Sequence, residues 1–175
     1  QLCSKGNYIF KERSNFLVGY LQLATEIYTK ISGNADDIIM QYESQLTQLS
    51  MEELFKNNQQ KDRILQRTSA GIHRDDLSFK MLGQVFKTEA SQGQRKSLLF
   101  ALKLAEWQVL KDQKGFTPIL LLDDVFEKLD EKRMYQLLNW VCKQSDGQVF
   151  ITDTHSERLK FQMHHINTQF QLIEL

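Results

Sequence analysis

An unbroken run of aliphatic residues, Ile119 to Leu122, is followed at once by two acids, Asp123 and Asp124. Such a run is typical of a β-strand that is covered on both faces, as in a parallel sheet packed between helices. Ligands of open α/β sheets bind beyond the carboxyl ends of the strands. The segment therefore predicts an α/β fold and places two carboxylates at the edge where a ligand would bind.

The acid pair fits two interpretations. One carboxylate can hold Mg2+, usually through water, while the next orients or deprotonates an attacking water molecule. Alternatively, a buried strand ends in a solvated acidic turn that has no chemical role. The pair alone does not decide between a catalytic edge and a surface turn.

The order of the expected elements supports the same fold class. Periodicity and capping signals predict helices over residues 8–31, 51–66, 92–111 and 131–142, and a short helix before residue 168. Strands are expected over residues 37–46, 119–122, 148–152 and 168–175, and a hairpin is expected to join 77–81 to 85–88. In the second half, strands that alternate with helices imply a parallel sheet with helical cover.

The chain is expected to have two parts. Residues 1–68 hold a heptad-patterned helix and a second helix for which Ser50 and Glu53 fit a capping box, and this segment is interpreted as a helical arm. The pattern changes at Ser69. Residues 69–175 are therefore assigned to a lobe that contains the acidic strand.

Composition narrows the partner classes only slightly. Lys plus Arg equals Asp plus Glu at 22 each, so the net charge gives no sign of a strongly nucleic-acid-binding surface. Cys3 and Cys142 are interpreted as reduced cytosolic thiols. The sequence has no apolar run of about 18 residues and no signal-peptide pattern. We therefore expect a cytoplasmic protein with no membrane partner.

A second motif, Ser91-Gln92-Gly93-Gln94, stands directly before the helix expected at 92–111. Ser91 is a good helix cap, and Gly93 lets the backbone approach a ligand closely. The exposed N–H groups of a helix start favour phosphate and other anions. The alternative is that the motif only caps the helix. Combined with the acid pair and with Glu127-Lys128-Leu129-Asp130, the motif favours a phosphate site.

Together these segments resemble the C-terminal half of an ABC-type ATPase head, the fold shared with SMC-like proteins. Within that superfamily the chain most resembles the RecF family, over about residues 70–155. Three stretches carry the closer match: Gly-Ile-His-Arg-Asp-Asp-Leu at 71–77, Ser-Gln-Gly-Gln at 91–94 and Leu-Leu-Leu-Asp-Asp-Val at 120–125. Asp124 is distinctive, because most ABC ATPases carry Glu there. Ile72 and Arg95 depart from the usual family pattern, which has Pro and Gln at these places.

The resemblance implies roles for the acidic edge. Asp123 ends the Walker B strand and would bind Mg2+, and Asp124 would position the attacking water. His155 stands near the switch histidine of ABC ATPases, where it would donate a hydrogen bond to the terminal phosphate of ATP. A polar residue in the turn after a strand is the alternative for His155.

The resemblance also implies a site shared between two heads. ATP bound to one head would be covered by the signature motif and D-loop of the other, to which this chain would contribute Ser91, Gln92, Gly93, Gln94 and Asp130. ATP would then drive formation of a homodimer, and hydrolysis would release it. The implied partners are single-strand/double-strand DNA junctions and RecR with RecO, in recombinase loading, replication, recombinational repair and the SOS response.

The phosphate-binding loop of such an ATPase is absent from this sequence. No Gly-x-x-x-x-Gly-Lys-Ser/Thr occurs, and the first residue is Gln1 rather than Met. In the RecF family this loop precedes the arm. We therefore expect the chain to be the C-terminal part of a longer ATPase and to be inactive alone.

Two other functions remain open. The head of another SMC-like ATPase is one, although the short arm argues against the very long coiled coils of those proteins. A scaffold that does not hydrolyse ATP is the other. The joint presence of Ser91, Gly93, Asp123, Asp124 and Asp130 argues against that loss of activity.

Two groups of residues have no firm role at this point. The segment from His73 to Asp76 marks the family, and a turn stabilised by Asp side chains is its alternative interpretation. Basic residues are candidates for DNA contact or form solvated helix faces. They are Lys5, Lys11, Arg13, Lys61, Arg63, Arg67 and Arg74.

Overall fold

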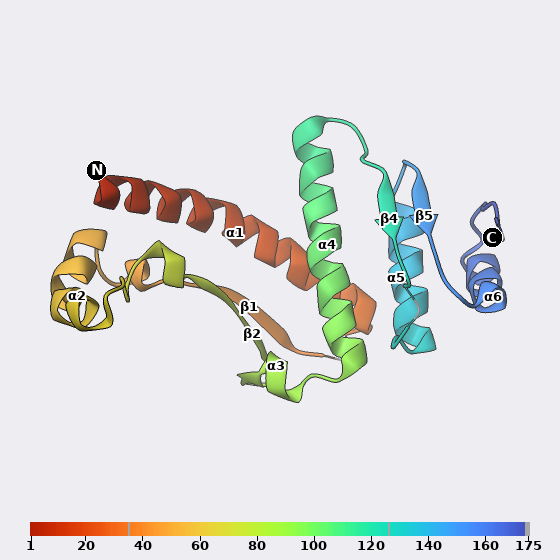
Figure 1. Ribbon diagram of the computed structural model, residues 1–175. Coiled ribbons are helices and arrows are strands. Elements are labelled where there is room, and N and C mark those ends of the chain that lie inside the picture. Colours follow the sequence, from red (N-terminus) through yellow and green to blue (C-terminus); the bar gives the residue numbers. More distant parts are fainter. Residues whose placement is uncertain (35, 126, 174–175) are drawn as a thin grey trace.

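The computed structural model describes residues 1–34, 36–125 and 127–173. A long helix and a narrow β-ribbon join a small cluster at one end to a larger lobe at the other (Figure 1). The first part contains α1 (Leu2–Ser32), β1 (Ile38–Glu43), the 3-10 turn η1 (Gln45–Thr47), α2 (Met51–Leu65) and the 3-10 turn η2 (Ile72–Arg74). The remainder contains β2 (Asp76–Met81), β3 (Gln84–Val85), α3 (Phe86–Glu89), α4 (Gln92–Lys114), β4 (Leu120–Leu122), α5 (Glu131–Gln144), β5 (Val149–Ile151) and α6 (Ser156–Ile166).

Helix α1 is longer than expected at its amino end but ends where predicted. Gly33 terminates it in the left-handed conformation, with φ of 66°, which glycine adopts without steric cost. At the other end the helix begins six residues earlier than the heptad pattern indicated. Gly6 lies there against Met51 of α2, so close that an added Cβ would lie 3.1 Å from the methyl carbon of Met51. Packing against α2 therefore extends the helix beyond its periodic stripe.

The core lies where the carboxyl half of α1 packs on α4 and α5. Its most deeply buried side chains recur at helical spacing on α1 and include Ala24, Ile27, Tyr28 and Ile31. The same cluster continues through β1, α4, β4 and α5. One hydrophobic core thus holds α1 against the helices that carry the candidate site.

The β-ribbon is antiparallel and runs from Ile38 paired with Met81 to Glu43 paired with Asp76. The predicted hairpin is confirmed, but its second strand is only two residues long. Residues 86–88, expected as strand, are helical in α3. Phe86 is buried edge-on against the Tyr28 ring, with the ring centroids 6.3 Å apart, and this burial turns the chain away from the ribbon.

Strand β1 precedes residue 68 and β2 follows it, so the ribbon crosses the division expected between arm and lobe. That division stays a prediction. At the far end of the arm, Arg13 of α1 donates to Asp75 at 3.1 Å and to the carbonyl oxygen of Ile72 at 2.9 Å. The Tyr42 hydroxyl of β1 also donates to Asp75, whose side chain is only 3% exposed. Asp75 therefore joins η2 to both α1 and β1.

The lobe contains the expected parallel strands, but the expected cover on both faces of β4 is wrong: Leu120 and Leu122 are buried, whereas Leu121 on the opposite face is 71% exposed. Leu120 to Leu122 of β4 pair in register with Val149 to Ile151 of β5. The strand expected at 168–175 is wrong over the described residues 168–173, which form no regular element; residues 174 and 175 lie outside the described chain. Alternating residues favour a strand only where a partner and a packing surface exist, and Ile173 remains 70% exposed. Within the described residues, no helix is both long and apolar enough to span a membrane.

Asp146 connects the end of α4 to the loops that flank the parallel strands. Its carboxylate accepts hydrogen bonds from Lys111 Nζ at 2.7 Å and from the Thr117 hydroxyl at 2.6 Å. These two bonds lower the pKa of Asp146 to about 2. Because this pKa lies below the ordinary value, ionised Asp146 stabilises the fold at pH values above 3.8, and the contribution is lost as the pH falls through about 2.

NMR titration of the Asp146 carboxyl carbon should give a midpoint near 2, which Lys111→Met should raise toward 3.8, the ordinary Asp value.

Candidate functional site

The two predicted acids lie at the carboxyl end of β4, beside the end of β5. The backbone N–H of Thr152 donates to the carbonyl oxygen of Leu122 at 2.9 Å, which continues the parallel pairing past the last strand residue. The Thr152 hydroxyl donates to the Asp123 carboxylate and accepts from the backbone N–H of Asp124 at 3.2 Å. Thr152 therefore holds both acids at one edge, a role that sequence reasoning missed. A polar residue ending the neighbouring parallel strand was the available signal.

Asp124 sits in a turn of unusual conformation. Its φ is 49°, in the left-handed region that Asp and Asn tolerate better than most residues. Its carbonyl oxygen accepts a hydrogen bond from Lys96 Nζ of α4 at 2.6 Å, while its side chain stays exposed. A hydrogen bond with the Asp124 side chain is the main cause that lowers the pKa of Glu127. The turn is thus tied to α4 and directs its carboxylate to solvent.

Ser91 begins α4 as a cap, as predicted. Its hydroxyl accepts from the Gln94 backbone N–H at 3.2 Å, and the Gln94 side chain accepts from the Ser91 N–H at 2.8 Å. The N–H groups of Gln92 and Gly93 precede the capped one, at the positive end of the helix dipole. Because Ser91 accepts through an oxygen lone pair, its own O–H proton can still be donated.

Gly93 lies against the loop that precedes α5. A Cβ added at Gly93 would lie 3.0 Å from the carbonyl oxygen of Lys128, a backbone atom that cannot move aside cheaply. Lys128 itself has a φ of 66°. Glycine at this position therefore permits the predicted signature segment and D-loop to touch.

Asp130 caps α5 and shares its carboxylate with Arg133 one turn later. One oxygen accepts from the Arg133 backbone N–H at 2.8 Å, and the other lies 3.3 Å from Nε of the guanidinium. The Asp130 side chain is 62% exposed, so it remains accessible at the surface. The spacing of three residues between the acid and the base was the local signal for this contact.

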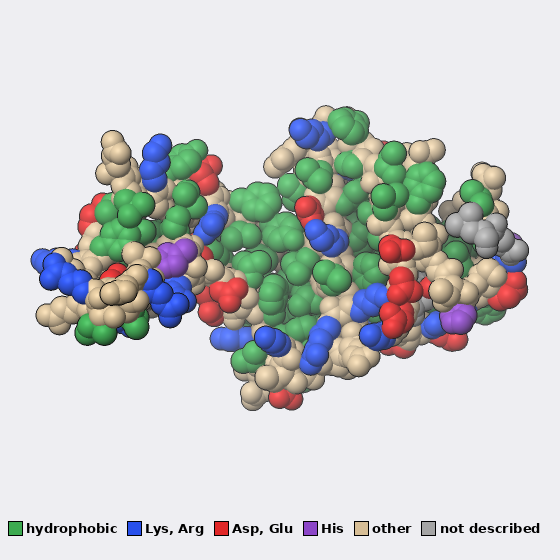
Figure 2. Space-filling model, in the orientation of Figure 1, with side chains coloured by type: hydrophobic (Ala, Val, Ile, Leu, Met, Phe, Trp, Pro, Cys, Tyr) green, Lys and Arg blue, Asp and Glu red, His purple; other side chains and the backbone are tan. Residues whose placement is uncertain are grey.

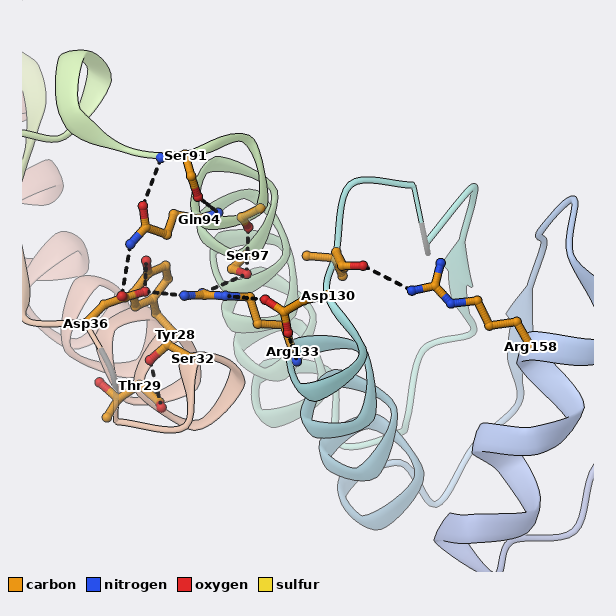
Figure 3. A network of polar contacts seen from close by, with 12 residues as sticks. Tyr28, Thr29, Ser32, Asp36, Ser91, Gln94, Ser97, Asp130, Arg133 and Arg158 are labelled. Atoms are coloured by element: carbon orange, nitrogen blue, oxygen red, sulfur yellow. Dashed lines mark hydrogen bonds and ion pairs between the residues drawn. The ribbon is translucent and has the colours of Figure 1, made fainter.

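Arg133 also forms a nearly buried ion pair with Asp36, which sequence reasoning missed (Figure 3). Burial works to raise the pKa of Asp36, but hydrogen bonds from Arg133, Gln94 and Tyr28 outweigh it and hold the pKa below its ordinary value. The hydroxyl of Tyr28 donates to Asp36 at 2.8 Å, and burial together with that bond raises the pKa of Tyr28. No sequence pattern joins Asp36 to residues so distant along the chain.

His155 follows β5 at the amino end of α6. Its backbone N–H donates to the Asp153 carboxylate at 2.7 Å, and its side chain is exposed. Because Thr152 is bonded to both acids, His155 belongs to the loop at the same sheet edge. Its predicted contact with phosphate stays a prediction.

The donor set suits the predicted Mg2+. Carboxylate and hydroxyl oxygens are the ligands that this ion prefers, and Mg2+ usually keeps several waters. Asp123 supplies an exposed carboxylate beside the Thr152 hydroxyl. Within residues 1–34, 36–125 and 127–173, no group of three or more His, Cys, Asp or Glu side chains could hold a metal ion. The predicted role of Asp123 in binding Mg2+ stays a prediction, with which its exposed carboxylate is compatible.

Basic side chains gather over α2 at the far end of the arm (Figure 2). Arg13, one of the candidates for DNA contact, is instead engaged by Asp75 and by the Ile72 carbonyl oxygen. The other candidates are exposed: Lys5, Lys11, Lys61, Arg63, Arg67 and Arg74. The arm thus presents positive charge at a distance from the predicted ATP site.

Comparison with curated proteins gives consistent likenesses. The chain is 44% identical over 158 residues to the DNA replication and repair protein RecF of Flavobacterium johnsoniae, covering 90% of this chain and 44% of that protein. It is 38% identical over 157 residues to the protein of the same name from Cytophaga hutchinsonii, covering 90% and 42%. The chain thus spans less than half the length of these relatives. No family model matches it.

Solved structures give the same likeness. The recombination mediator protein RecF with ATPrS, described as part of the RecFOR pathway, superposes with a TM-score of 0.67 at 27% identity. RecF with ATP gives a TM-score of 0.66 at 28% identity. Each match covers 89% of this chain, and 44% and 43% of the respective structure. The likeness confirms the predicted fold class, the C-terminal lobe of an ABC-type ATPase head with an N-terminal helical arm.

Proposed function

Because the chain belongs to the RecF family and corresponds to a C-terminal portion of its members, we propose that it supplies half of a composite ATP site in a DNA replication and repair protein. In the full-length protein, ATP on one head is covered by Ser91 and Gly93 of a second head. ATP binding joins two heads into a clamp on DNA, and hydrolysis releases them. Residues outside this chain bind the adenine base and the phosphates of the ATP molecule that belongs to the same head.

The contact between Gly93 and the Lys128 carbonyl oxygen is the observation that carries this proposal. It makes the start of α4 and the loop before Asp130 one continuous edge, and these are the two segments that must meet ATP on the opposite head. The exposed end of α4 favours a phosphate through its N–H groups and its dipole. Ser91 adds a hydroxyl proton that the cap leaves available.

The acidic edge is proposed to serve hydrolysis in cis. Asp123 holds Mg2+, which when bound would neutralise charge on the phosphates. Asp124 orients the attacking water, and the Thr152 hydroxyl and backbone contacts keep the two acids in register. His155 donates a hydrogen bond to the terminal phosphate. Asp130 couples the two sites across the dimer.

The names of the relatives support a role in DNA replication and repair, and we propose that this work takes place in the cytoplasm. RecFOR context in the solved structures supports work alongside RecO and RecR, which we extend to recombinase loading. We propose that the clamp engages DNA at single-strand/double-strand junctions. The exposed basic residues of the arm are the surface best suited to phosphate contact.

Light scattering of the full-length protein with and without ATP and Mg2+ tests the composite site. We expect ATP to convert the wild-type protein from monomer to dimer and expect Ser91→Arg to abolish this change. The long arginine side chain would occupy the space into which the opposite phosphate must enter. ATP binding to the separate head should persist, because the variant leaves the cis contacts intact.

Ser50→Arg is the matched control. Ser50 caps α2 with the same reciprocal bonds to Glu53 that Ser91 makes to Gln94, so both variants lose a serine cap worth about 1 kcal/mol. Of the two variants, only Ser50→Arg should still dimerise with ATP. If the wild type does not dimerise with ATP, the scaffold without turnover becomes the better function.

A further inference from the structure

We propose that Asp36 and Arg133 act as a positioning pair that fixes the signature segment at 91–94 relative to the loop at 128–130. The inference rests on the proposed function, since these are the two segments assigned to ATP on the opposite head. Neither Asp36 nor Arg133 touches nucleotide in this proposal. Their role is to hold the residues that do.

The Arg133 guanidinium contacts three parts of the fold at once (Figure 3). Nη2 donates to Asp36, in the connection between α1 and β1, at 2.8 Å. Nη1 donates to the Ser97 hydroxyl of α4 at 3.3 Å, and Nε lies 3.3 Å from Asp130. A planar guanidinium fixes the direction of each of these bonds, which a lysine ammonium would not do. Arg133 thus fixes the orientation of the Asp130 carboxylate.

Asp36 makes the corresponding connection to the start of α4. Its Oδ1 accepts from the Gln94 side-chain amide at 2.9 Å, and the same amide group accepts from the Ser91 backbone N–H at 2.8 Å. The Ser97 hydroxyl, bonded to Arg133, donates in turn to the carbonyl oxygen of Gly93 at 2.9 Å. Two hydrogen-bonded routes therefore lead from Arg133 to the signature segment.

Burial makes this arrangement stiff. The side chains of Asp36 and Arg133 are 8% and 12% exposed, and Tyr28 supplies a further bond to Asp36. A nearly buried charge that loses its partner is costly, so the pair favours one geometry strongly over alternatives. Well-packed apolar residues often stabilise a core as well as a buried ion pair does. The role of this pair is therefore to position Ser91 and Asp130, to which its hydrogen bonds lead, rather than to add stability.

The positions of these two segments matter because a site assembled between two heads needs the right geometry from each head. A misplacement of about 1 Å away from the reacting atoms is enough to lower a rate by roughly 100-fold. Loosening the pair should accordingly lower turnover more than it lowers ATP binding to a separate head. That difference distinguishes positioning from simple support of the fold.

The test uses the full-length protein with Asp36→Asn, Arg133→Lys and the double variant. Asp36→Asn keeps the size of the side chain, and Arg133→Lys keeps the positive charge but not the planar guanidinium. Lys132→Gln is the matched control, because Lys132 is exposed and lies next to Arg133 on α5. Three quantities are compared: ATP affinity of the separate head, kcat of ATP hydrolysis, and the thermal midpoint of unfolding.

We expect each single variant to lower kcat by roughly 100-fold with ATP affinity unchanged. The double variant should lose little more than either single variant, because the two residues act as one unit. Lys132→Gln should behave as wild type. Single variants whose kcat falls only in proportion to the fraction unfolded would overturn the positioning role.

Amide hydrogen exchange without nucleotide separates this inference from the proposed function. Asp36→Asn should speed exchange in both 91–94 and 128–130, although Asp36 lies in neither segment. If the wild type shows no response to ATP, the proposed function fails and the exchange data still decide whether the pair fixes the two segments. Unchanged exchange in both segments contradicts the inference, whatever the ATP response.

Discussion

Asp124→Asn in the full-length protein is expected to lower ATP turnover by about 10² to 10⁴-fold while ATP still drives dimerisation. The loss is the usual contribution of a residue that orients or deprotonates an attacking water. Asparagine also tolerates left-handed backbone, so the φ of 49° at this position need not change. The backbone contacts to Thr152 and Lys96 are kept as well. Single-turnover hydrolysis by the preformed dimer measures the effect directly.

Glu106→Gln serves as the control for that experiment. It removes one exposed carboxylate charge from α4 and leaves Asp124 and its contacts unchanged. Turnover should stay close to the wild-type rate. Equal losses in the two variants would mean that the net charge of the lobe, rather than the Asp124 carboxylate, governs hydrolysis.

Leu104→Ala should destabilise the fold by about 2–5 kcal/mol, the range measured when a buried leucine is truncated. Leu104 is fully buried in the cluster that α1, α4 and α5 share, so its removal leaves a cavity at the centre of the lobe. Urea unfolding followed by circular dichroism gives the change in free energy from the midpoint.

Leu99→Ala on the same helix is the comparison. Leu99 is 56% exposed, and surface substitutions usually stay within about 0.5 kcal/mol. Both substitutions remove the same atoms and leave helix propensity equally changed. Similar losses at the two positions would show that α4 is not packed as the structure describes.

The parts of the site that sequence reasoning located share a local signal. Ser91 and Gln94 are three residues apart, the spacing at which a cap and its reciprocal partner meet on any helix start. Asp123 and Asp124 directly follow β4, so the pairing of β4 with β5 determines the edge at which they lie. Neighbouring residues are sufficient to specify each of these arrangements.

The remainder depends on contacts between distant residues. Asp36 and Arg133 are 97 positions apart, and neither belongs to a motif. Thr152 meets Asp123 only because β5 pairs with β4 in one particular register. The strand expected at 168–175 is wrong over the described residues 168–173 for the same reason, since its pattern needs a neighbouring strand that the described residues do not provide.

The two connections between the lobe and the end of the arm have a mechanical consequence. Helix α1 has 31 residues and is about 46 Å long, and the β1–β2 ribbon runs beside it to the same cluster (Figure 1). Two elements connected at both ends, here α1 and the ribbon, resist hinge bending far better than a single helix does. At the outer end, the contacts of Asp75 with Arg13 and Tyr42 connect them. A tilt of about 5° at the lobe would then sweep the outer end through roughly 4 Å, given the length of the helix. Small rotations of the lobe thereby become displacements of atomic size at the basic end of the molecule.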